Sequence, residues 1–439
     1  MDFGPEALWS CLRRFDAPAA YRVAFSGGPD STALLCALVA LGDRVPSPVN
    51  AIHVDHRIHP GSTRWATHCQ AVCTRLGVPL TSLVVSVDAQ DPSGPEAAAR
   101  RARYAALAAC LAPGELVLTA HHRDDQVETV LLALLRGSGP EGLAGMPRWR
   151  PLGAGGLARP LLDVDRAALH AYAERCGVAT VADPSNDSAR LARGHLRQRV
   201  VPALAAYWSG HGEAVARSAR LCAEAATILS EVGRADRARC AGPRTDTLSV
   251  AGLTALSLPR QRNALRIWLR ERGLPTPSEA VLAELVRQVH ASDDRQPRVT
   301  WPGGEVRRFA GSLYAMGPVR PLGVRGLMPW RLTKLLRLPN GWLEAVPVRG
   351  AGLRRHALSD CLEVGYRVGG ERFQPRGSGG RQALSELFRR QQVPPWERDR
   401  RPLAYRDGRL LWVAGLGVAE GAGAAPGEPG WELRWRAQG

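Results

Sequence analysis

The sequence predicts an α/β protein with a doubly wound parallel sheet, followed by a helical domain and a small α+β domain at the carboxyl end. The first observation behind this prediction is the alternation of short apolar runs with longer helical patterns over about the first 200 residues. Repeated strand-then-helix order is typical of a parallel sheet, whose binding site lies at the carboxyl ends of the strands. The second observation is the length of 439 residues, which exceeds one compact core and predicts several domains.

Each strand expected in the sheet is followed directly by an expected helix. Gly77 and Gly137 end two of these helices, because glycine adopts the left-handed backbone conformation without strain. The last helix begins with Asp124 and Asp125, which the helix dipole favours at that end. The strands are expected over residues 21–25, 50–54, 79–87 and 115–120, and the helices over residues 31–41, 64–77, 94–111 and 124–137.

The pattern changes beyond about residue 201. Residues 217–239 and 259–273 are amphipathic with helical periodicity, and the stretch PVRPLGVRGLMPWRL is punctuated by proline and indicates a connector. We therefore predict a parallel-sheet domain over residues 1–205, a helical domain over 206–317, a linker over 318–357 and an α+β domain over 358–439. In the last domain, strands are expected within 362–368 and 410–416 and a helix within 381–390.

The charge balance indicates a polyanionic partner. Lysine and arginine total 58 against 41 acidic residues, which gives a net charge of +17. Such a chain is typical of nucleic-acid binding, and a generically basic surface is the alternative. No segment has the ~18 uninterrupted apolar residues of a membrane span, and the first residues do not resemble a secretory signal, so a cytoplasmic protein without a membrane partner is expected. The nine cysteines include no CxxC pair, which argues against a four-thiolate metal site.

The string SGGPDST lies directly after the first expected strand and directly before a helix. Its glycines let backbone amides approach an anion closely, and the helix amino end adds positive potential. Asp30 suits a magnesium ion shared with phosphates. The string lacks the lysine of the GxxxxGK[ST] loop, and a plain glycine turn capped by serine or aspartate is the alternative. The predicted phosphate loop consists of Ser26, Gly27, Gly28, Pro29, Asp30 and Ser31.

Two carboxylates in HHRDDQVET are candidates for catalysis. Asp125 and Glu128 are three residues apart on an expected helix, so both project from one face toward the strand ends. Such a pair can hold Mg²⁺, bind a substrate ammonium group or take a proton from an incoming amine. The alternative is a solvated first turn, which fits Asp124.

The loop motif resembles the SGGxDS pattern of the PP-loop (N-type) ATP pyrophosphatase superfamily, whose members cleave ATP between the α- and β-phosphates to adenylate a substrate. The resemblance implies the adenine nucleotide alpha hydrolase-like fold. Further motifs, in order, resemble the tRNA(Ile)-lysidine synthetase branch in its long form. They are HVDHRIHPGS (53–62), EAAARRARY (96–104), the segment 119–146, DPSN (183–186), GGERFQPRG (369–377) and PPWERDRRPL (394–403).

The resemblance implies an activity and its substrates. A member of this branch adenylates the wobble cytidine of tRNA(Ile) with the anticodon CAU, and then attaches free L-lysine to carbon 2 of the base. The product, lysidine, changes codon reading from AUG to AUA. ATP and Mg²⁺ are the implied cofactors, and residues 206–317 and 358–439 become candidate tRNA-binding domains.

The resemblance also implies roles for single residues. His56 belongs to three histidines at spacing three (His53, His56 and His59), for which a zinc site is the alternative. Arg100 and Arg101 fit a solvated basic helix face, and Trp396 fits either RNA stacking or a core position. The implied catalytic residues are Asp30, His121, Asp125 and Glu128, with Asp30 also as the Mg²⁺ ligand; the nucleotide contacts are the loop residues with Asp55, His56 and Arg103. The implied tRNA contacts are Arg193, Arg197, Arg376, Arg381, Arg398 and Arg400.

The sequence departs from the family pattern after DPSN. Position 188 is Ser where the family usually has Asp, Asp187 comes one place early, and Gly194 replaces an Asn. Two other functions remain open, a PP-loop tRNA thiolase and a non-catalytic RNA-binding protein. The sequence leaves the oligomeric state open, a homodimer included.

Overall fold

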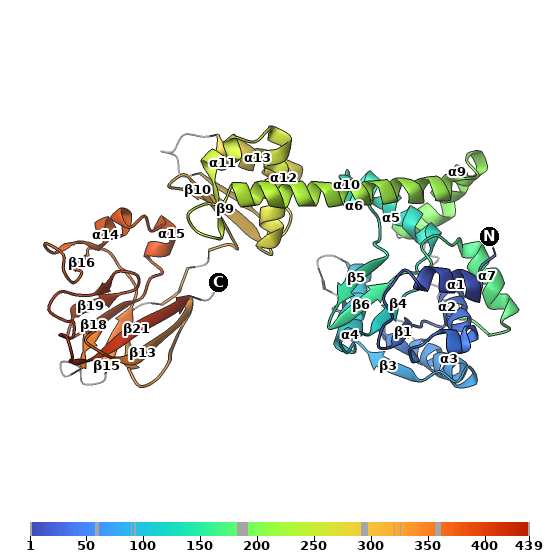
Figure 1. The fold of residues 1–439 in the computed structure, drawn as a ribbon, viewed down its shortest axis with the longest axis horizontal. Coiled ribbons are helices and arrows are strands. Elements are labelled where there is room, and N and C mark those ends of the chain that lie inside the picture. The colour runs from blue at the N-terminus through green and yellow to red at the C-terminus, as the bar shows by residue number, and fades with distance from the viewer. Residues whose placement is uncertain are drawn as a thin grey trace. The chain divides into compact units, whose positions relative to one another are not determined.

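The computed structural model describes residues 2–57, 61–88, 90–91, 94–181, 192–290, 297–319, 321–324, 326–355 and 361–437. It divides into two compact units, Met1–Leu229 and Ser230–Gly439 (Figure 1). Within the described residues, no helix combines the length and the apolar character needed to span a bilayer.

The first unit is built on a six-stranded sheet with the order β3-β2-β1-β4-β6-β5. All its neighbouring strands are parallel except β5, which runs antiparallel to β6. The predicted doubly wound fold is therefore confirmed, with an added antiparallel edge strand. The strands are β1 (Tyr21–Ala24), β2 (Val49–Asp55), β3 (Leu80–Val84), β4 (Leu116–Leu118), β5 (Trp149–Leu152) and β6 (Gly155–Ala158).

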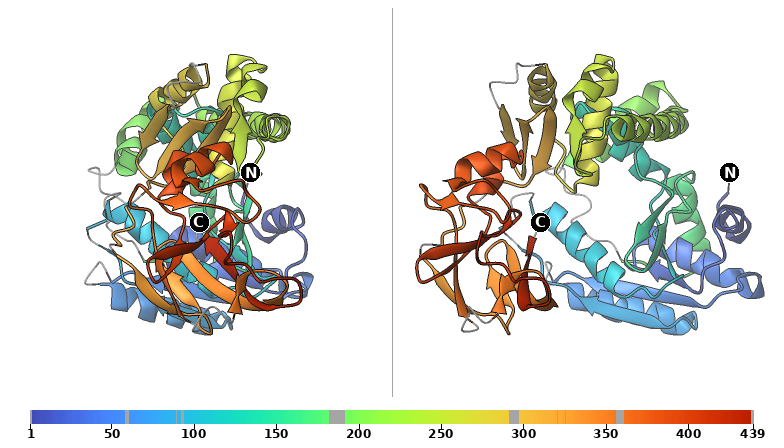
Figure 2. Two further views of the ribbon diagram at one scale, coloured as in Figure 1. Left: turned by 90° about the vertical axis from the view of Figure 1, so that its left-hand side faces the viewer. Right: turned by 60° about the vertical axis from the view of Figure 1, so that its left-hand side comes forward.

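Helices cover both faces of this sheet, because its central strands are apolar on both sides. Leu116 and Leu118 of β4 belong to a core shared with α1, α2, α3 and α7, whereas Val117 between them belongs to a second core shared with α4. Figure 2 shows this unit, coloured blue to green, from two further sides. The helices are α1 (Pro5–Leu12), α2 (Pro29–Ala40), α3 (Ser62–Arg75), α4 (Pro95–Ala109), α5 (Arg123–Leu135), α6 (Pro140–Leu143) and α7 (Arg166–Arg175).

Helical segments follow the sheet and lead into the second unit. These are α8 (Ala192–His195), a π-helical turn (Leu196–Val200), α9 (Val201–Tyr207) and α10 (His211–Arg239). Helices α11 (Val250–Thr254), α12 (Leu258–Glu271) and α13 (Glu279–Val289) come next. The helices predicted around residues 217–239 and 259–273 are thus present.

The region predicted to be helical also contains an antiparallel sheet with the order β7-β10-β9-β8. Its strands are β7 (Thr247–Ser249), β8 (Arg298–Trp301), β9 (Gly304–Phe309) and β10 (Ser312–Met316). In β9, a buried charge interrupts the apolar alternation that would predict a strand. Glu305 is fully buried and forms ion pairs with Arg298 on the adjacent strand and with Arg307.

Residues 328–354, predicted as part of a linker, instead form strands. They are β11 (Met328–Arg331), β12 (Leu336–Leu338), β13 (Gly341–Arg349) and β14 (Leu353–Arg354). Of the prolines that suggested a connector, Pro318 and Pro321 precede β11, and Pro329 lies in β11, at the edge of its sheet, where proline is tolerated. The linker prediction is therefore wrong for these residues.

The last residues complete two sheets, β11-β15-β18-β19-β20 and β12-β13-β21-β14, beside a two-stranded ribbon of β16 and β17. The two predicted strands are present as β15 and β19, and the predicted helix as α14. The elements are β15 (Cys361–Gly365), β16 (Arg372–Phe373), β17 (Gln382–Ala383), α14 (Leu384–Arg390), α15 (Pro395–Arg398), β18 (Leu403–Arg406), β19 (Arg409–Val413), β20 (Gly417–Val418) and β21 (Pro429–Ala437).

Candidate active site

The loop after β1 is a preformed turn at the amino end of α2. Ser31 Oγ accepts a hydrogen bond from the Ser26 amide at 3.2 Å and donates one to the carbonyl oxygen of Gly28 at 3.1 Å. Gly27 has a left-handed φ of 78°, and a Cβ there would lie 3.1 Å from Cys69 Sγ. Glycine is therefore required by both backbone and space, and the turn leaves the helix amino end available to an anion.

His53 contacts the end of the strand that leads into this loop. Its side chain is buried, and its Nδ1 lies 3.0 Å from the carbonyl oxygen of Phe25, the last residue before the loop. Asp55 and His56, predicted on the nucleotide side, are half-buried at the carboxyl end of β2, next to β1. Of the histidines behind the zinc alternative, His59 lies outside the described residues. The position of His53 gives it a structural role.

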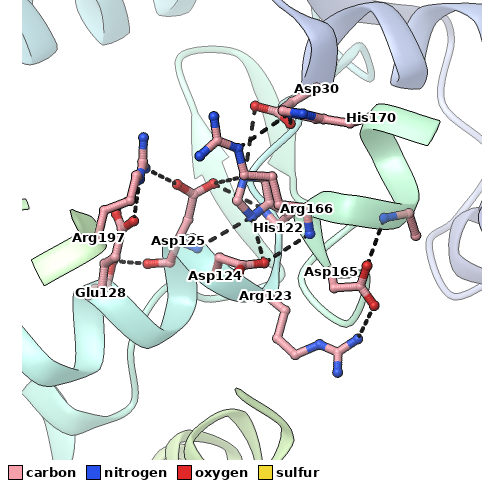
Figure 3. Close-up of polar contacts among 12 residues, drawn as sticks. Asp30, His122, Arg123, Asp124, Asp125, Glu128, Asp165, Arg166, His170 and Arg197 are labelled. Atoms are coloured by element: carbon pink, nitrogen blue, oxygen red, sulfur yellow. Dashed lines mark hydrogen bonds and ion pairs between the residues drawn. The ribbon is translucent and has the colours of Figure 1, made fainter. Parts of the chain in front are cut away.

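Asp30 extends from the loop between two histidines of other elements (Figure 3). Its Oδ1 lies 3.1 Å from His170 Nε2 on α7, and its Oδ2 lies 3.8 Å from His122 Nε2. The Asp30 side chain is 33% exposed, so one carboxylate face remains open. Sequence reasoning missed His170, because it is 140 residues from Asp30 and belongs to no motif.

His122 is the N-cap of α5 and lies between three carboxylates. The Asp125 amide nitrogen lies 3.4 Å from His122 Nδ1, and the His122 amide donates to Asp125 Oδ2 at 3.1 Å. Nδ1 also lies 3.5 Å from Asp124 Oδ2. Burial by itself would lower the pKa of His122, but the carboxylates of Asp124, Asp125 and Asp30 together raise it above its usual range. The imidazole therefore links the loop to the first turn of α5.

Asp125 and Glu128 share one face of α5, as predicted, but they differ in environment. Glu128 is 1% exposed, and Arg197 donates to both its oxygens, Nε to Oε1 at 2.7 Å and Nη2 to Oε2 at 3.1 Å. Asp125 Oδ1 lies 3.6 Å from the same guanidinium. Arg197, predicted as a tRNA contact, is thus committed to the carboxylates. Arg193, the other predicted tRNA contact in this region, donates to Thr129 Oγ1 at 3.1 Å.

Asp124 joins α5 to α7 and is not only a solvated helix-start residue. Its Oδ2 accepts a hydrogen bond from the backbone amide of Arg166 at 2.9 Å. Burial would raise the pKa of Asp124, but the hydrogen bonds from His122 and the Arg166 amide lower it to about 2. On the same turn, Arg123 forms an ion pair with Asp165 at 3.2 Å. The amino ends of the two helices are therefore held together.

His121 follows β4 and directly precedes the N-cap of α5. Its Nδ1 is 2.8 Å from Thr119 Oγ1. Burial, reinforced by the positive charges of Arg159, Arg103 and Arg100, lowers the pKa of His121 to about 3, although Asp125 opposes that shift. The ring is therefore neutral near pH 7 and can form hydrogen bonds without adding charge.

The predicted tRNA contacts near the carboxyl end lie in the second unit. Arg381 Nε donates to the carbonyl oxygen of Arg372 at 3.4 Å, and Arg398 Nε to that of Val393 at 2.8 Å. Arg376 follows β16, and Arg400 follows α15. Trp396 is half-buried, with ring centroids 5.3 Å from Tyr314 and 6.1 Å from Phe309. It therefore packs against other aromatic side chains.

The motif DPSN at 183–186, together with Asp187 and Ser188, lies outside the described residues. Gly194 is buried in α8, one residue after Arg193. The departure at 194 therefore lies at a packed helical position.

Comparisons with known proteins agree with the order of the motifs. A PP-loop domain matches residues 10–204, a TilS substrate binding domain matches 248–314, and a TilS substrate C-terminal domain matches 362–435. The tRNA(Ile)-lysidine synthase of Alkalilimnicola ehrlichii is 41% identical over 440 residues, covering 97% of this chain and 96% of that protein. That of Methylococcus capsulatus is 40% identical over 401 residues, covering 90% and 91%. That of Coxiella burnetii is 35% identical over 434 residues, covering 98% and 96%.

Proposed function

The chain belongs to the tRNA(Ile)-lysidine synthase family, and on this premise we propose that it joins L-lysine to carbon 2 of the wobble cytidine in a tRNA(Ile) with the anticodon CAU. ATP is consumed to AMP and pyrophosphate. One observation carries the proposal: the preformed SGGPDS loop lies beside buried carboxylates at the carboxyl edge of one sheet, joined to them through Asp30 and His122.

The first step is adenylation of the base. The O2 oxygen of cytosine attacks the α-phosphorus of ATP, and pyrophosphate leaves with the electrons of the broken P–O bond. Loop amides and the amino end of α2 face the developing negative charge. His170 and His122 hold the Asp30 carboxylate at the edge of the loop.

The residues of the loop fit a magnesium ion. Mg²⁺ prefers one or two carboxylate oxygens together with substrate phosphates, and Asp30 offers a part-exposed carboxylate next to the phosphate loop. When bound there, the ion would offset charge on the phosphates. The chain supplies the oxygen ligand and fixes its direction.

The second step is attack of the ε-amine of lysine on carbon 2, with AMP leaving together with the former carbonyl oxygen. The ε-ammonium group must bind and release one proton to solvent before its nitrogen can attack. Burial would raise the pKa of Asp125, but the positive charges of His122 and Arg197 keep it below its usual range, so this carboxylate is ionised and suits ammonium binding better than proton abstraction. Glu128 acts through Arg197 and is a positioning residue for Asp125.

Two alternatives receive less support from the described site. A thiolase needs a reactive thiolate, but burial raises the pKa of Cys69, next to the loop, to about 12, and that of Cys73 to about 11. A non-catalytic RNA-binding protein does not account for the preformed loop or for the carboxylates beside it.

Product analysis separates these functions. With tRNA(Ile) of anticodon CAU, multiple-turnover pyrophosphate release is expected to require both the tRNA and lysine, with labelled lysine recovered in the tRNA. Release that is independent of lysine, or no release, contradicts the proposal.

A further inference from the structure

A second charged group lies next to the carboxylates and has no counterpart in the mechanism above. Three guanidinium carbons lie over the ring of Tyr104, at 5.2 Å for Arg100, 5.5 Å for Arg103 and 4.8 Å for Arg150, measured to the ring centroid. Arg159, which follows β6, adjoins the same tyrosine. We call these five residues the arginine–tyrosine cluster. Arg100, expected on a solvated face, is thus half-buried in it.

Among the described residues, the cluster has no compensating acid. In the described part of the chain, none of its four arginines forms an ion pair, whereas Arg22, Arg123 and Arg197 of the same unit each have a carboxylate partner. Gathering like charges in a part-buried place is unfavourable without a counter-ion, so acidic partners for these arginines would be expected. The charge is therefore available to an external anion.

A buried polar atom without a hydrogen-bond partner also indicates that the cluster can bind an anion. Arg159 is 2% exposed, and while its Nη1 donates to the carbonyl oxygen of Pro147 at 2.6 Å, its Nε has no hydrogen-bond partner. The Tyr104 hydroxyl adjoins the Arg159 side chain within the cluster. Burial opposes ionisation of that hydroxyl, but the guanidiniums of Arg100, Arg103 and Arg159 lower its pKa. A buried donor without a partner is uncommon in native structures and is normally satisfied by a bound water, ion or ligand.

The position of the cluster separates it from the phosphate loop. The loop follows β1, whereas Arg159 follows β6 and Arg150 lies on β5, two and three strands further along the sheet. Neighbouring strands are about 4.8 Å apart, so these arginines are roughly 10–14 Å from the strand that carries the loop. His121 lies between, under the influence of both Asp125 and the arginines. The carboxylates thus have a phosphate loop on one side and an arginine group on the other.

We propose that the arginine–tyrosine cluster binds a phosphodiester of the tRNA next to the wobble cytidine. This inference rests on the proposed function, which places the cytidine between the loop and Asp125. Guanidinium groups bind phosphate oxygens through paired hydrogen bonds, and such backbone contacts fix the register of a nucleic acid. Arg103, predicted as a nucleotide contact, is assigned here to the RNA together with the rest of the cluster, because the pyrophosphate of ATP already has its own site at the loop.

The test is the variant Arg150→Gln in the full chain, with Arg101→Gln as the matched control. Arg101 lies on the same helix as Arg100, is exposed, and forms an ion pair with Asp91, so the control removes the same charge outside the cluster. Direct binding of tRNA(Ile) at several salt concentrations and equilibrium binding of ATP are measured. Arg150→Gln is expected to weaken tRNA binding about tenfold and to reduce the salt slope by about 0.7, the value for one single-strand phosphate, with ATP affinity unchanged.

Several results would overturn the inference. Unchanged tRNA affinity, or an equal loss in Arg101→Gln, would show that the cluster makes no specific contact. Weaker ATP binding with normal tRNA binding would assign the cluster to the nucleotide. Tyr104→Phe keeps the ring and guards against a folding defect, and it is expected to weaken tRNA binding as well. A chain that binds tRNA but forms no lysidine would contradict the proposed function while leaving this test intact.

Discussion

The carboxylate centre and the arginine–tyrosine cluster are neighbours that differ in how their charges are compensated. The carboxylate centre consists of Asp30, His122, Asp124, Asp125, Glu128 and Arg197. In the centre, each charge has a partner within the chain: Glu128 pairs with Arg197, and Asp30, Asp124 and Asp125 surround His122. In the cluster, four arginines surround one tyrosine without an ion pair among the described residues. The difference indicates that the centre keeps its geometry before substrates bind, whereas the cluster is completed by an anion.

The largest expected effect is a loss of the adenylation step with tRNA binding intact. Asp30→Ala is expected to reduce pyrophosphate release at least about 100-fold, because the charge at the phosphate loop is lost, while tRNA affinity stays within about twofold. Single-turnover pyrophosphate release measures adenylation, and equilibrium tRNA binding measures the affinity for RNA. Asp43→Ala removes an exposed aspartate just after α2 and serves as the control. An active Asp30→Ala enzyme would show that Asp30 is not needed for adenylation.

Removal of the carboxyl-terminal sheets is expected to have the opposite effect, a loss of tRNA binding with ATP binding intact. Truncation before residue 318 is expected to weaken tRNA binding at least about tenfold and to lower its salt dependence, because phosphate contacts are lost, with ATP affinity unchanged. A cut at Leu358 would be unsuitable, because it leaves β13 without its partner β21. If the shorter chain binds tRNA with the same affinity and salt slope, these sheets have another role.

A smaller effect is expected inside the centre. Glu128→Gln keeps the size of the side chain but removes the charge that pairs with Arg197, which in turn adjoins Asp125. Adenylation is expected to continue, while lysine transfer slows about tenfold and the free energy of unfolding falls by about 1–3 kcal/mol. Rapid-quench assays with labelled ATP and labelled lysine separate the steps. Glu174→Gln, at an exposed position of α7, is the control; normal transfer in Glu128→Gln would refute the positioning role.

The smallest effect concerns pH. The pKa of Asp124 is lowered from 3.8 to about 2, so its charge stabilises the folded state above pH 3.8, and this contribution is lost as the pH falls toward 2. Asp124→Asn is therefore expected to be less stable than the parent by about 1 kcal/mol at pH 7, a value reduced for the 41% exposure of the side chain. Denaturant unfolding from pH 7 to pH 3 measures the difference, which should shrink as the pH falls; a constant difference would contradict the assignment.

The parts of the site that are contiguous in sequence were predictable, and the parts that only the fold brings together were not. The loop from Ser26 to Ser31 and the pair Asp125 and Glu128 follow from local spacing, because a strand-to-helix turn and a helix face are local features. His170 and Arg150 belong to separate elements, and no local pattern connects them to Asp30 or Tyr104.

The same reasoning explains the fold. The parallel sheet was predictable, since its strands are apolar on both faces. In the second unit, β15 and β19 were predictable, whereas β9 was not, because Glu305 is buried through ion pairs with Arg298 and Arg307 and breaks the apolar alternation of that strand.

The most direct test of the account follows both labels through one reaction. Tritiated lysine and ATP labelled in the γ-phosphate are mixed with the full chain and tRNA(Ile) of anticodon CAU, and the tRNA is digested to nucleosides. The account predicts one pyrophosphate released per lysine incorporated, with the lysine attached to the wobble cytidine. Pyrophosphate released without lysine in the tRNA, or label on another nucleoside, would contradict it.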